Sequence, residues 1–153
     1  AGFSMGGLIA AYLANRFPVR RLVLLNAAVF YVSPGRFLRN VVRQIRTGNL
    51  NALRVKRDVP VKAVLEFTKL VYALKPEFSR ITIPTFVAQG EMDEIVHPLS
   101  AFYIMKRIRG HKELVVYPNS RHMICLEPDA SALFEHVGAF LTNNGNKAEE
   151  SMA

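Results

Sequence analysis

The sequence predicts an α/β architecture in which a parallel sheet is flanked by helices. Short apolar runs alternate along the chain with stretches in which apolar residues recur at helical spacing. The runs are continuous rather than alternating, which is typical of strands buried on both faces of a parallel sheet. The three clearest runs are 22–26, 83–88 and 113–117.

Each of these strands has a helical pattern beside it. Pro84 lies near the start of its strand, where a missing N–H donor is tolerated. Gly110 follows one helical pattern and is expected to be its C-cap. The apolar positions that predict helices are Leu8, Ile9, Tyr12 and Leu13, then Phe102, Met105 and Ile108, and last Leu133, Phe134, Val137, Phe140 and Leu141.

The segment 33–75 interrupts the alternation and is too long for a simple loop. Two amphipathic patterns predict helices within it. We therefore expect residues 1–32 and 76–142 to form the core, residues 33–75 to form a small helical cap, and residues 143–153 to form a disordered tail. The two apolar faces are Phe37, Leu38, Val41, Val42 and Ile45, and Val64, Leu65, Phe67, Leu70, Val71 and Leu74.

The positive charge of the chain is concentrated in this same insertion. The formal net charge is +8 over 153 residues. Seven basic residues and no acidic one lie between positions 36 and 57. Three interpretations stay open: a solvated helix face, a lid over the site, and contact with an anionic membrane surface. No aromatic interleaving accompanies the charge, so nucleic-acid binding is not expected. The arginines of the first helix are Arg36, Arg39, Arg43 and Arg46.

Length and composition exclude several classes of protein. A chain of 153 residues supports one domain. No apolar run approaches the roughly 20 residues of a membrane span. A single cysteine, Cys125, excludes an internal disulfide and a Cys-based zinc site, and it fits a reducing compartment. We expect a cytoplasmic protein without metal or cofactor.

The first residues carry a motif with chemical meaning. Positions 2–6 read G-x-S-x-G and precede a helical pattern. A sharp strand-to-helix turn would expose the Ser4 hydroxyl, and the close approach of neighbouring backbones requires small residues two positions on either side. The N–H of Met5, at the helix start, would point to a developing oxyanion. By itself the pattern also fits a glycine-rich turn.

A serine nucleophile needs a base, and the base needs an orienting acid. The strand 83–88 leads into Glu91, Asp93 and Glu94, and the strand ending at Tyr117 leads into His122. Acid and base thus follow the serine in order, at the carboxyl ends of successive strands, where parallel sheets place their sites.

These motifs together resemble the C-terminal portion of an α/β-hydrolase of the bacterial carboxylesterase and monoacylglycerol-lipase type. The similarity extends from Gly2 to about Leu141. It rests on the Ser4 turn, on 83–96 with its G-x-x-D-x-x-V spacing, and on 120–128. The resemblance implies an α/β-hydrolase fold with Ser4 as nucleophile, Asp93 as acid and His122 as base, acting on short- or medium-chain esters or monoacylglycerols.

Competing assignments remain at the sequence level. Glu91 and Glu94 flank Asp93, although the spacing favours Asp93. His97, His111 and His136 are expected at the surface, and Cys125 is expected to be a small buried hydrophobe. A thioesterase, acyltransferase or peptidase would use the same triad. A non-catalytic remnant that binds a membrane or partner through its basic helix is the alternative outside enzymes.

The order of the motifs also leads to an expectation about completeness. The first methionine is Met5, and the motif of the nucleophile stands at the start of the chain. In the family that the chain resembles, further strands and the second oxyanion donor precede this motif. The resemblance therefore implies an incomplete parallel sheet that belongs to a longer protein, with that donor outside these residues. We also expect the strand 22–26 to present an unpaired edge.

Overall fold

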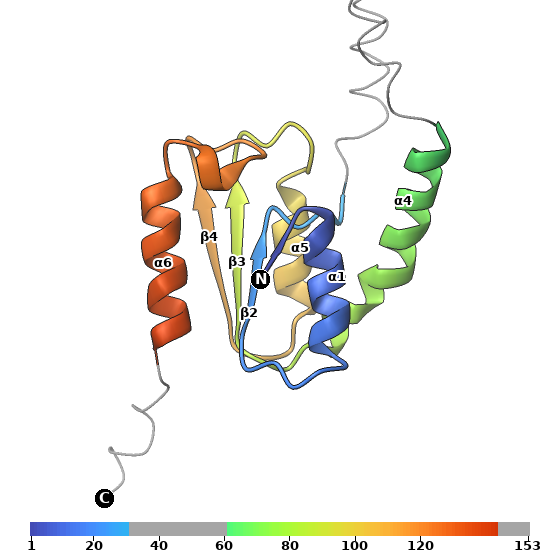
Figure 1. Cartoon of the computed structure of the whole chain (residues 1–153), viewed down its shortest axis with the longest axis horizontal. Helices are drawn as coiled ribbons and strands as arrows, with labels where there is room; N and C mark the ends of the chain where they lie inside the picture. Colours follow the sequence, from blue (N-terminus) through green and yellow to red (C-terminus); the bar gives the residue numbers. More distant parts are fainter. Residues whose placement is uncertain (31–60, 144–153) are drawn as a thin grey trace, which may run out of the picture.

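The computed structural model describes residues 1–30 and 61–143 (Figure 1). The chain alternates strand and helix throughout this part, as expected for an α/β fold. The elements are β1 (Gly2–Phe3), α1 (Met5–Ala14), β2 (Leu22–Leu25), α4 (Val61–Leu74), the 3₁₀ helix η2 (Lys75–Arg80), β3 (Thr85–Gly90), α5 (Leu99–Arg107), β4 (Lys112–Tyr117), the 3₁₀ helix η3 (Ile124–Leu126) and α6 (Ala130–Thr142).

The four strands form one parallel sheet in the order β1-β2-β3-β4. All three predicted strands are confirmed, and β3 is displaced by two residues. It begins at Thr85 because Pro84 has no N–H, and the Pro84 carbonyl instead accepts the Leu22 N–H at 3.0 Å. It continues to Gly90, which pairs with Tyr117 of β4.

Two expectations about the strands need correction. Strand β2 is an unpaired edge only in its first half, because Leu24 and Leu25 pair with Gly2 and Phe3, whereas Leu22 and Val23 have no partner in β1. Strand β4 is not buried on both faces, because it is the last strand of the described sheet and only Tyr117 within it is buried. A continuous apolar run therefore marks an edge strand here as well as the inner ones.

Helices cover both faces of the sheet (Figure 1). On one face, α1 and α5 pack on Leu22, Leu24 and Val87. On the other, α6 packs through Leu133 and Phe140 against side chains that include Val23, Phe86 and Ala88. The alternation of inward and outward side chains along β2 and β3 thus supplies two separate cores.

The second amphipathic pattern of the predicted cap is confirmed as helix α4. Its Phe67, Val71 and Leu74 pack against the core cluster beside α1. The first pattern, with its arginines, lies in 31–60 and therefore outside the described residues, as does the tail 144–153. Among the helices of the described part, none is long and apolar enough to cross a bilayer.

Two helix ends are set by specific contacts. The expected C-cap at Gly110 is wrong: α5 ends at Arg107, and the buried Ile108 turns the chain into an extended conformation. Gly110 is needed for another reason, since a Cβ there would lie 2.2 Å from the Thr82 carbonyl oxygen.

At the end of α6, the Arg21 guanidinium donates hydrogen bonds to the carbonyls of Phe140 and Asn143. A positive charge is favoured at a helix C-terminus.

The small residues around Ser4 serve unequal purposes. A Cβ on Gly2 would lie 2.3 Å from the Gly6 carbonyl oxygen, which confirms the need for glycine before the serine. A Cβ on Gly6 would meet no described atom within 4 Å, so the expected close approach at that position is wrong. The contact occurs one residue later, where a Cβ on Gly7 would lie 2.5 Å from the Ala27 Cβ. At Gly7, helix α1 therefore closely approaches the segment that follows β2.

This difference can be tested with two alanine substitutions in the same helical turn. Gly7→Ala should lower the free energy of unfolding by about 1–3 kcal/mol, because α1 must move away from Ala27. Gly6→Ala is the matched control and should stay within about 1 kcal/mol of wild type, since alanine favours helix. Urea unfolding measures both. Equal destabilisation by the two variants would contradict the packing argument.

The junction between α1 and η2 contains a buried carboxylate. Glu77 is 6% exposed and accepts hydrogen bonds from Arg16 at 3.2 and 3.3 Å, from Asn15 Nδ2 at 2.8 Å and from Arg80 at 3.2 Å. The hydrogen bond from Arg16, together with those from Asn15 and the charge of Arg80, lowers the pKa of Glu77 against the opposing effect of burial. The ionised form of Glu77 therefore stabilises the fold.

We expect Glu77→Gln to lower the free energy of unfolding by about 1–3 kcal/mol at neutral pH. The pKa of Glu77 is depressed in the folded state, so its contribution is complete above the ordinary value of 4.5 and disappears as pH falls through the lower folded value. The difference between wild type and variant should accordingly shrink below that pH. Urea unfolding across the acid range measures it, with the exposed Glu66→Gln as control. A difference independent of pH would contradict the assignment.

Candidate active site

Ser4 forms the sharp turn between β1 and α1. Its φ is 51° and its ψ is −122°, in a region that costs non-glycine residues on the order of 1–3 kcal/mol. Hydrogen bonds hold this conformation: the Ser4 N–H donates to the Leu25 carbonyl at 2.9 Å, and the Ser4 carbonyl accepts from Gly7 at 3.0 Å and Ala28 at 3.1 Å. The backbone of Ser4 is thus anchored to β2 and to the residues that follow it.

Met5 is the first residue of α1. The N–H groups of the first helical turn have no acceptor within the helix, and they lie at the positive end of its dipole. The Met5 N–H is therefore a backbone donor adjacent to Ser4, which is the arrangement that the motif predicted.

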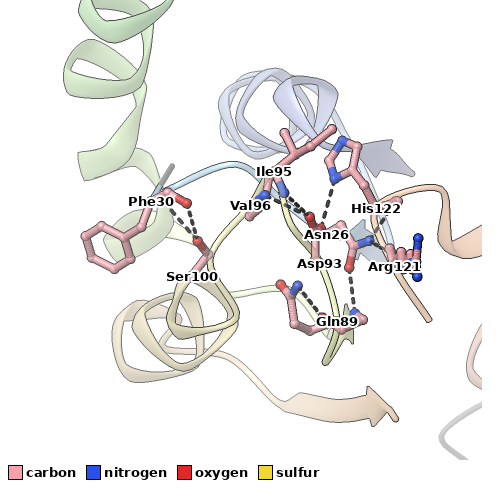
Figure 2. A network of polar contacts seen from close by, with 10 residues as sticks. Asn26, Phe30, Gln89, Asp93, Ile95, Val96, Ser100, Arg121 and His122 are labelled. Atoms are coloured by element: carbon pink, nitrogen blue, oxygen red, sulfur yellow. Dashed lines mark hydrogen bonds and ion pairs between the residues drawn. The ribbon is translucent and has the colours of Figure 1, made fainter. Parts of the chain in front are cut away.

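Asp93 lies in the loop after β3 and is 4% exposed. Its Oδ1 accepts the N–H groups of Ile95 and Val96, each at 2.8 Å. Its Oδ2 lies 2.8 Å from His122 Nδ1 (Figure 2). One oxygen is thus fixed by its own loop, and the other is directed at the imidazole.

His122 follows β4 and is 8% exposed. Its ring lies beside Phe3, with 5.0 Å between the ring centroids, and Phe3 directly precedes Ser4. The contact with Asp93 directs the Nδ1–H toward the carboxylate when the proton is on that nitrogen, which leaves Nε2 as an acceptor. His122 is therefore oriented by Asp93 and lies close to the serine turn.

The three predicted residues are brought to the same edge of the sheet by three different loops. Asp93 and His122 are hydrogen-bonded to each other. Between Ser4 Oγ and His122, both in the described part of the chain, the structure shows no hydrogen bond. Such bonds are often long in ligand-free sites and shorten when substrate is bound.

The competing residues have other surroundings. Glu91 and Glu94 are exposed, and Asp93 is the carboxylate of this loop that contacts His122. His111 is exposed and lies 3.0 Å from Glu113, while His136 lies 2.9 Å from the Tyr117 hydroxyl. The half-buried His97 accepts the Leu99 N–H through Nδ1 at 3.2 Å, and Cys125 is half-buried beside the α6 core.

The loop of His122 is also attached to the start of α6. Asp129 accepts hydrogen bonds from the Asn119 N–H at 2.9 Å and from the Ser120 hydroxyl at 3.0 Å. Burial opposes ionisation of Asp129, but these hydrogen bonds, with one from the Asn119 side chain, leave its pKa below the ordinary value. Burial, with the charge of Asp129, raises the pKa of Tyr117 to about 12, so this phenol stays protonated.

Asn26 is a buried polar residue of this edge that the motifs do not reveal. Its side chain contacts the loops of both Asp93 and His122 (Figure 2). The sequence gives only one indication of its role, namely that Asn26 is a polar residue directly after an apolar strand. Across residues 1–30 and 61–143, no three His, Cys, Asp or Glu side chains gather as metal ligands would.

Comparison with known proteins places the chain among hydrolases. The family model of serine aminopeptidase S33 matches residues 37–129. A thermostable monoacylglycerol lipase from Bacillus sp. (strain H-257) is 27% identical over 155 residues, which cover 94% of this chain and 62% of the lipase. The chain therefore spans less than two thirds of the length of this relative.

Solved structures share the fold. A structure from a study of two metagenome-derived lipolytic enzymes, LipS and LipT, matches with a TM-score of 0.70 at 23% identity. The match covers 92% of this chain and 62% of the chain in that structure. The Paleococcus ferrophilus monoacylglycerol lipase has a TM-score of 0.66 at 16% identity, with coverage of 92% and 66%. The fold predicted from the sequence is confirmed, and the chain belongs to the serine aminopeptidase S33 family of α/β-hydrolases.

Proposed function

We propose that this chain carries the catalytic residues of a serine hydrolase that cleaves carboxylic esters. The observation that carries the proposal is the 2.8 Å contact between Asp93 Oδ2 and His122 Nδ1 beside the turn of Ser4. A nucleophile, a base and an orienting acid are the three parts that acyl transfer needs. The similarity to a monoacylglycerol lipase supports the ester class.

In the proposed mechanism, His122 Nε2 removes the proton of the Ser4 hydroxyl while Ser4 Oγ attacks the ester carbonyl carbon. The tetrahedral oxyanion accepts a hydrogen bond from the Met5 N–H. The imidazolium then protonates the departing alcohol, and the C–O bond to the alcohol breaks, which leaves an acyl-Ser4 ester. His122 then deprotonates a water molecule, which attacks the acyl-Ser4 ester and forms a second tetrahedral intermediate. When this intermediate collapses, the bond to Ser4 Oγ breaks, the carboxylic acid is released and His122 returns the proton to Ser4.

The surroundings of the site favour an apolar acyl group. Several exposed apolar side chains lie within four positions of the proposed catalytic residues in the sequence: Met5, Met92, Ile95, Met123 and Leu126. Such side chains bury well against an acyl chain and gain roughly 25 cal/mol per Å² of apolar surface removed from water. Together with the similarity to a monoacylglycerol lipase, these side chains support short- and medium-chain acyl esters or monoacylglycerols as the proposed substrates.

A peptidase is the second candidate, because the family description names an aminopeptidase. The same serine, base and acid would cleave an amide if the leaving amine were protonated by His122. The full-length protein should be assayed on p-nitrophenyl butyrate and on aminoacyl p-nitroanilides in parallel. Preference for the anilides would favour the peptidase.

Ser4→Ala should abolish covalent labelling by a fluorophosphonate probe and should lower ester turnover by roughly 10⁴-fold or more. The physical reason is that the Ser4 hydroxyl is the proposed nucleophile, so the alanine variant has no oxygen there to attack the ester or the probe. Labelling is read by mass spectrometry of the modified peptide, and Ser131→Ala, at an exposed serine of α6, serves as the serine control. Absence of both labelling and turnover in the wild-type, full-length protein would favour the non-catalytic alternative.

Asp93→Asn should lower kcat by roughly 10⁴-fold with a small effect on KM, because the amide stabilises the wrong tautomer of His122. Glu91→Gln and Glu94→Gln are matched controls on the same loop, and both should keep activity close to wild type. Steady-state kinetics on p-nitrophenyl butyrate measures the three variants. A loss in Glu94→Gln as large as that in Asp93→Asn would overturn the assignment of the acid.

A further inference from the structure

Asn26 adopts a backbone conformation that needs an explanation. It lies directly after β2 and has a φ of 44°, in the left-handed region. Asparagine tolerates this region better than most residues, but glycine would adopt it without strain. Asn26 is also completely buried, with 0% of its surface exposed. A buried amide in a strained position suggests that the side chain has a specific task.

Every hydrogen-bonding group of the Asn26 side chain is used (Figure 2). Its Nδ2 donates to the carbonyls of Arg121 at 3.0 Å and His122 at 2.8 Å. Its Oδ1 accepts the Gly90 N–H at 2.7 Å. These partners define the orientation of the amide, since the two carbonyls can only accept and the N–H can only donate.

The partners belong to the two loops that carry the acid and the base. Gly90 is the last residue of β3, three positions before Asp93, and the other two partners are Arg121 and His122 itself. The loops approach so closely that a Cβ on Gly90 would lie 2.6 Å from the Ser120 carbonyl oxygen and 2.7 Å from that of Arg121. The Asn26 amide therefore connects both loops to the end of β2.

We propose that Asn26 is a positioning residue that sets the distance and orientation of His122 relative to Asp93. Its side chain hydrogen-bonds to backbone atoms of Gly90, three residues before Asp93, and of Arg121 and His122. Its catalytic consequence rests on the hydrolase function proposed above. An error of about 1 Å in the position of a catalytic group can cost roughly 10²-fold in rate, so loss of the amide should act on kcat rather than on substrate binding.

The main test compares Asn26→Asp and Asn26→Gly with wild type. Aspartate keeps the shape and the acceptor for the Gly90 N–H but cannot donate to the two carbonyls when ionised. Glycine keeps the left-handed conformation and removes the whole side chain. Both variants should lose about 10²-fold in kcat on p-nitrophenyl butyrate with KM within about threefold of wild type. Wild-type kcat in both folded variants would overturn the proposal.

Asn15→Ala provides a matched control. Asn15 Nδ2 also donates two hydrogen bonds, to the Glu77 carbonyl at 3.0 Å and to its carboxylate at 2.8 Å, at the α1–η2 junction. Its loss should lower stability and leave kcat close to wild type. A fall of kcat in Asn15→Ala as large as in the Asn26 variants would show that general destabilisation is sufficient, and it would overturn the positioning role.

A readout without catalysis separates this proposal from the proposed function. The proton between His122 Nδ1 and Asp93 Oδ2 should give a ¹H resonance far downfield of the amide region in the full-length protein. The resonance should persist in the inactive Ser4→Ala and should broaden or vanish in Asn26→Asp. If no ester is hydrolysed but this pattern is found, the hydrolase proposal fails and the role of Asn26 stands. An unchanged resonance in Asn26→Asp would overturn that role.

A measurement on the wild type covers the case in which both Asn26 variants fail to fold. The side-chain NH₂ of Asn26 donates two buried hydrogen bonds, so its hydrogens should exchange with solvent at least about 10²-fold more slowly than those of a free asparagine amide. Exchange at the free rate would show that the contacts to the His122 loop are not maintained in solution, and it would overturn the proposal.

Discussion

Parallel pairing of β3 with both of its neighbours is the constraint on which the site depends. Strand β3 pairs with β2 over four residues and with β4 over six. Because the strands run in the same direction, their carboxyl ends meet at one edge, and the residues that follow them are brought together. Asp93 and His122 are separated by 29 positions in sequence but lie 2.8 Å apart for this reason. The helices contribute by burying both faces, which holds the register.

Backbone strain occurs at two residues at the carboxyl end of the parallel strands. Among the described residues, the non-glycine residues with positive φ are Ser4 and Asn26. Each such conformation costs on the order of 1–3 kcal/mol and persists when surrounding contacts stabilise it. At Ser4 the contacts are backbone hydrogen bonds, and at Asn26 they are a backbone hydrogen bond to the Ala88 carbonyl and the hydrogen bonds of the side chain. Strain is thus located where side chains must be directed, while the rest of the sheet is regular.

Local sequence patterns predicted which segments form helices and strands, but they predicted less well which of these elements contact each other. Apolar runs and helical spacing identified the strands and helices, and the order of Ser4, Asp93 and His122 was visible because each follows a strand. Contacts between elements were harder to predict from the sequence. The two residues of β1 pair with half of β2, and the close approach of α1 to Ala27 falls on Gly7 rather than Gly6. The task of Asn26 depends on three loops distant in sequence, so no local pattern could reveal it.

The segment from Leu25 to Ala28 connects all parts of the proposed machinery. The Leu25 carbonyl and the Ala28 N–H hold the backbone of Ser4 at 2.9 and 3.1 Å. Between them, the Asn26 side chain is hydrogen-bonded to Gly90 at the end of β3 and to the loop of His122. Ser4 and the loops of Asp93 and His122, the proposed nucleophile, acid and base, are therefore attached by hydrogen bonds to the same four residues. A displacement of this segment would move Ser4 and His122 together, whereas loss of the Asn26 amide would move one relative to the other, which is why kcat is the quantity expected to change.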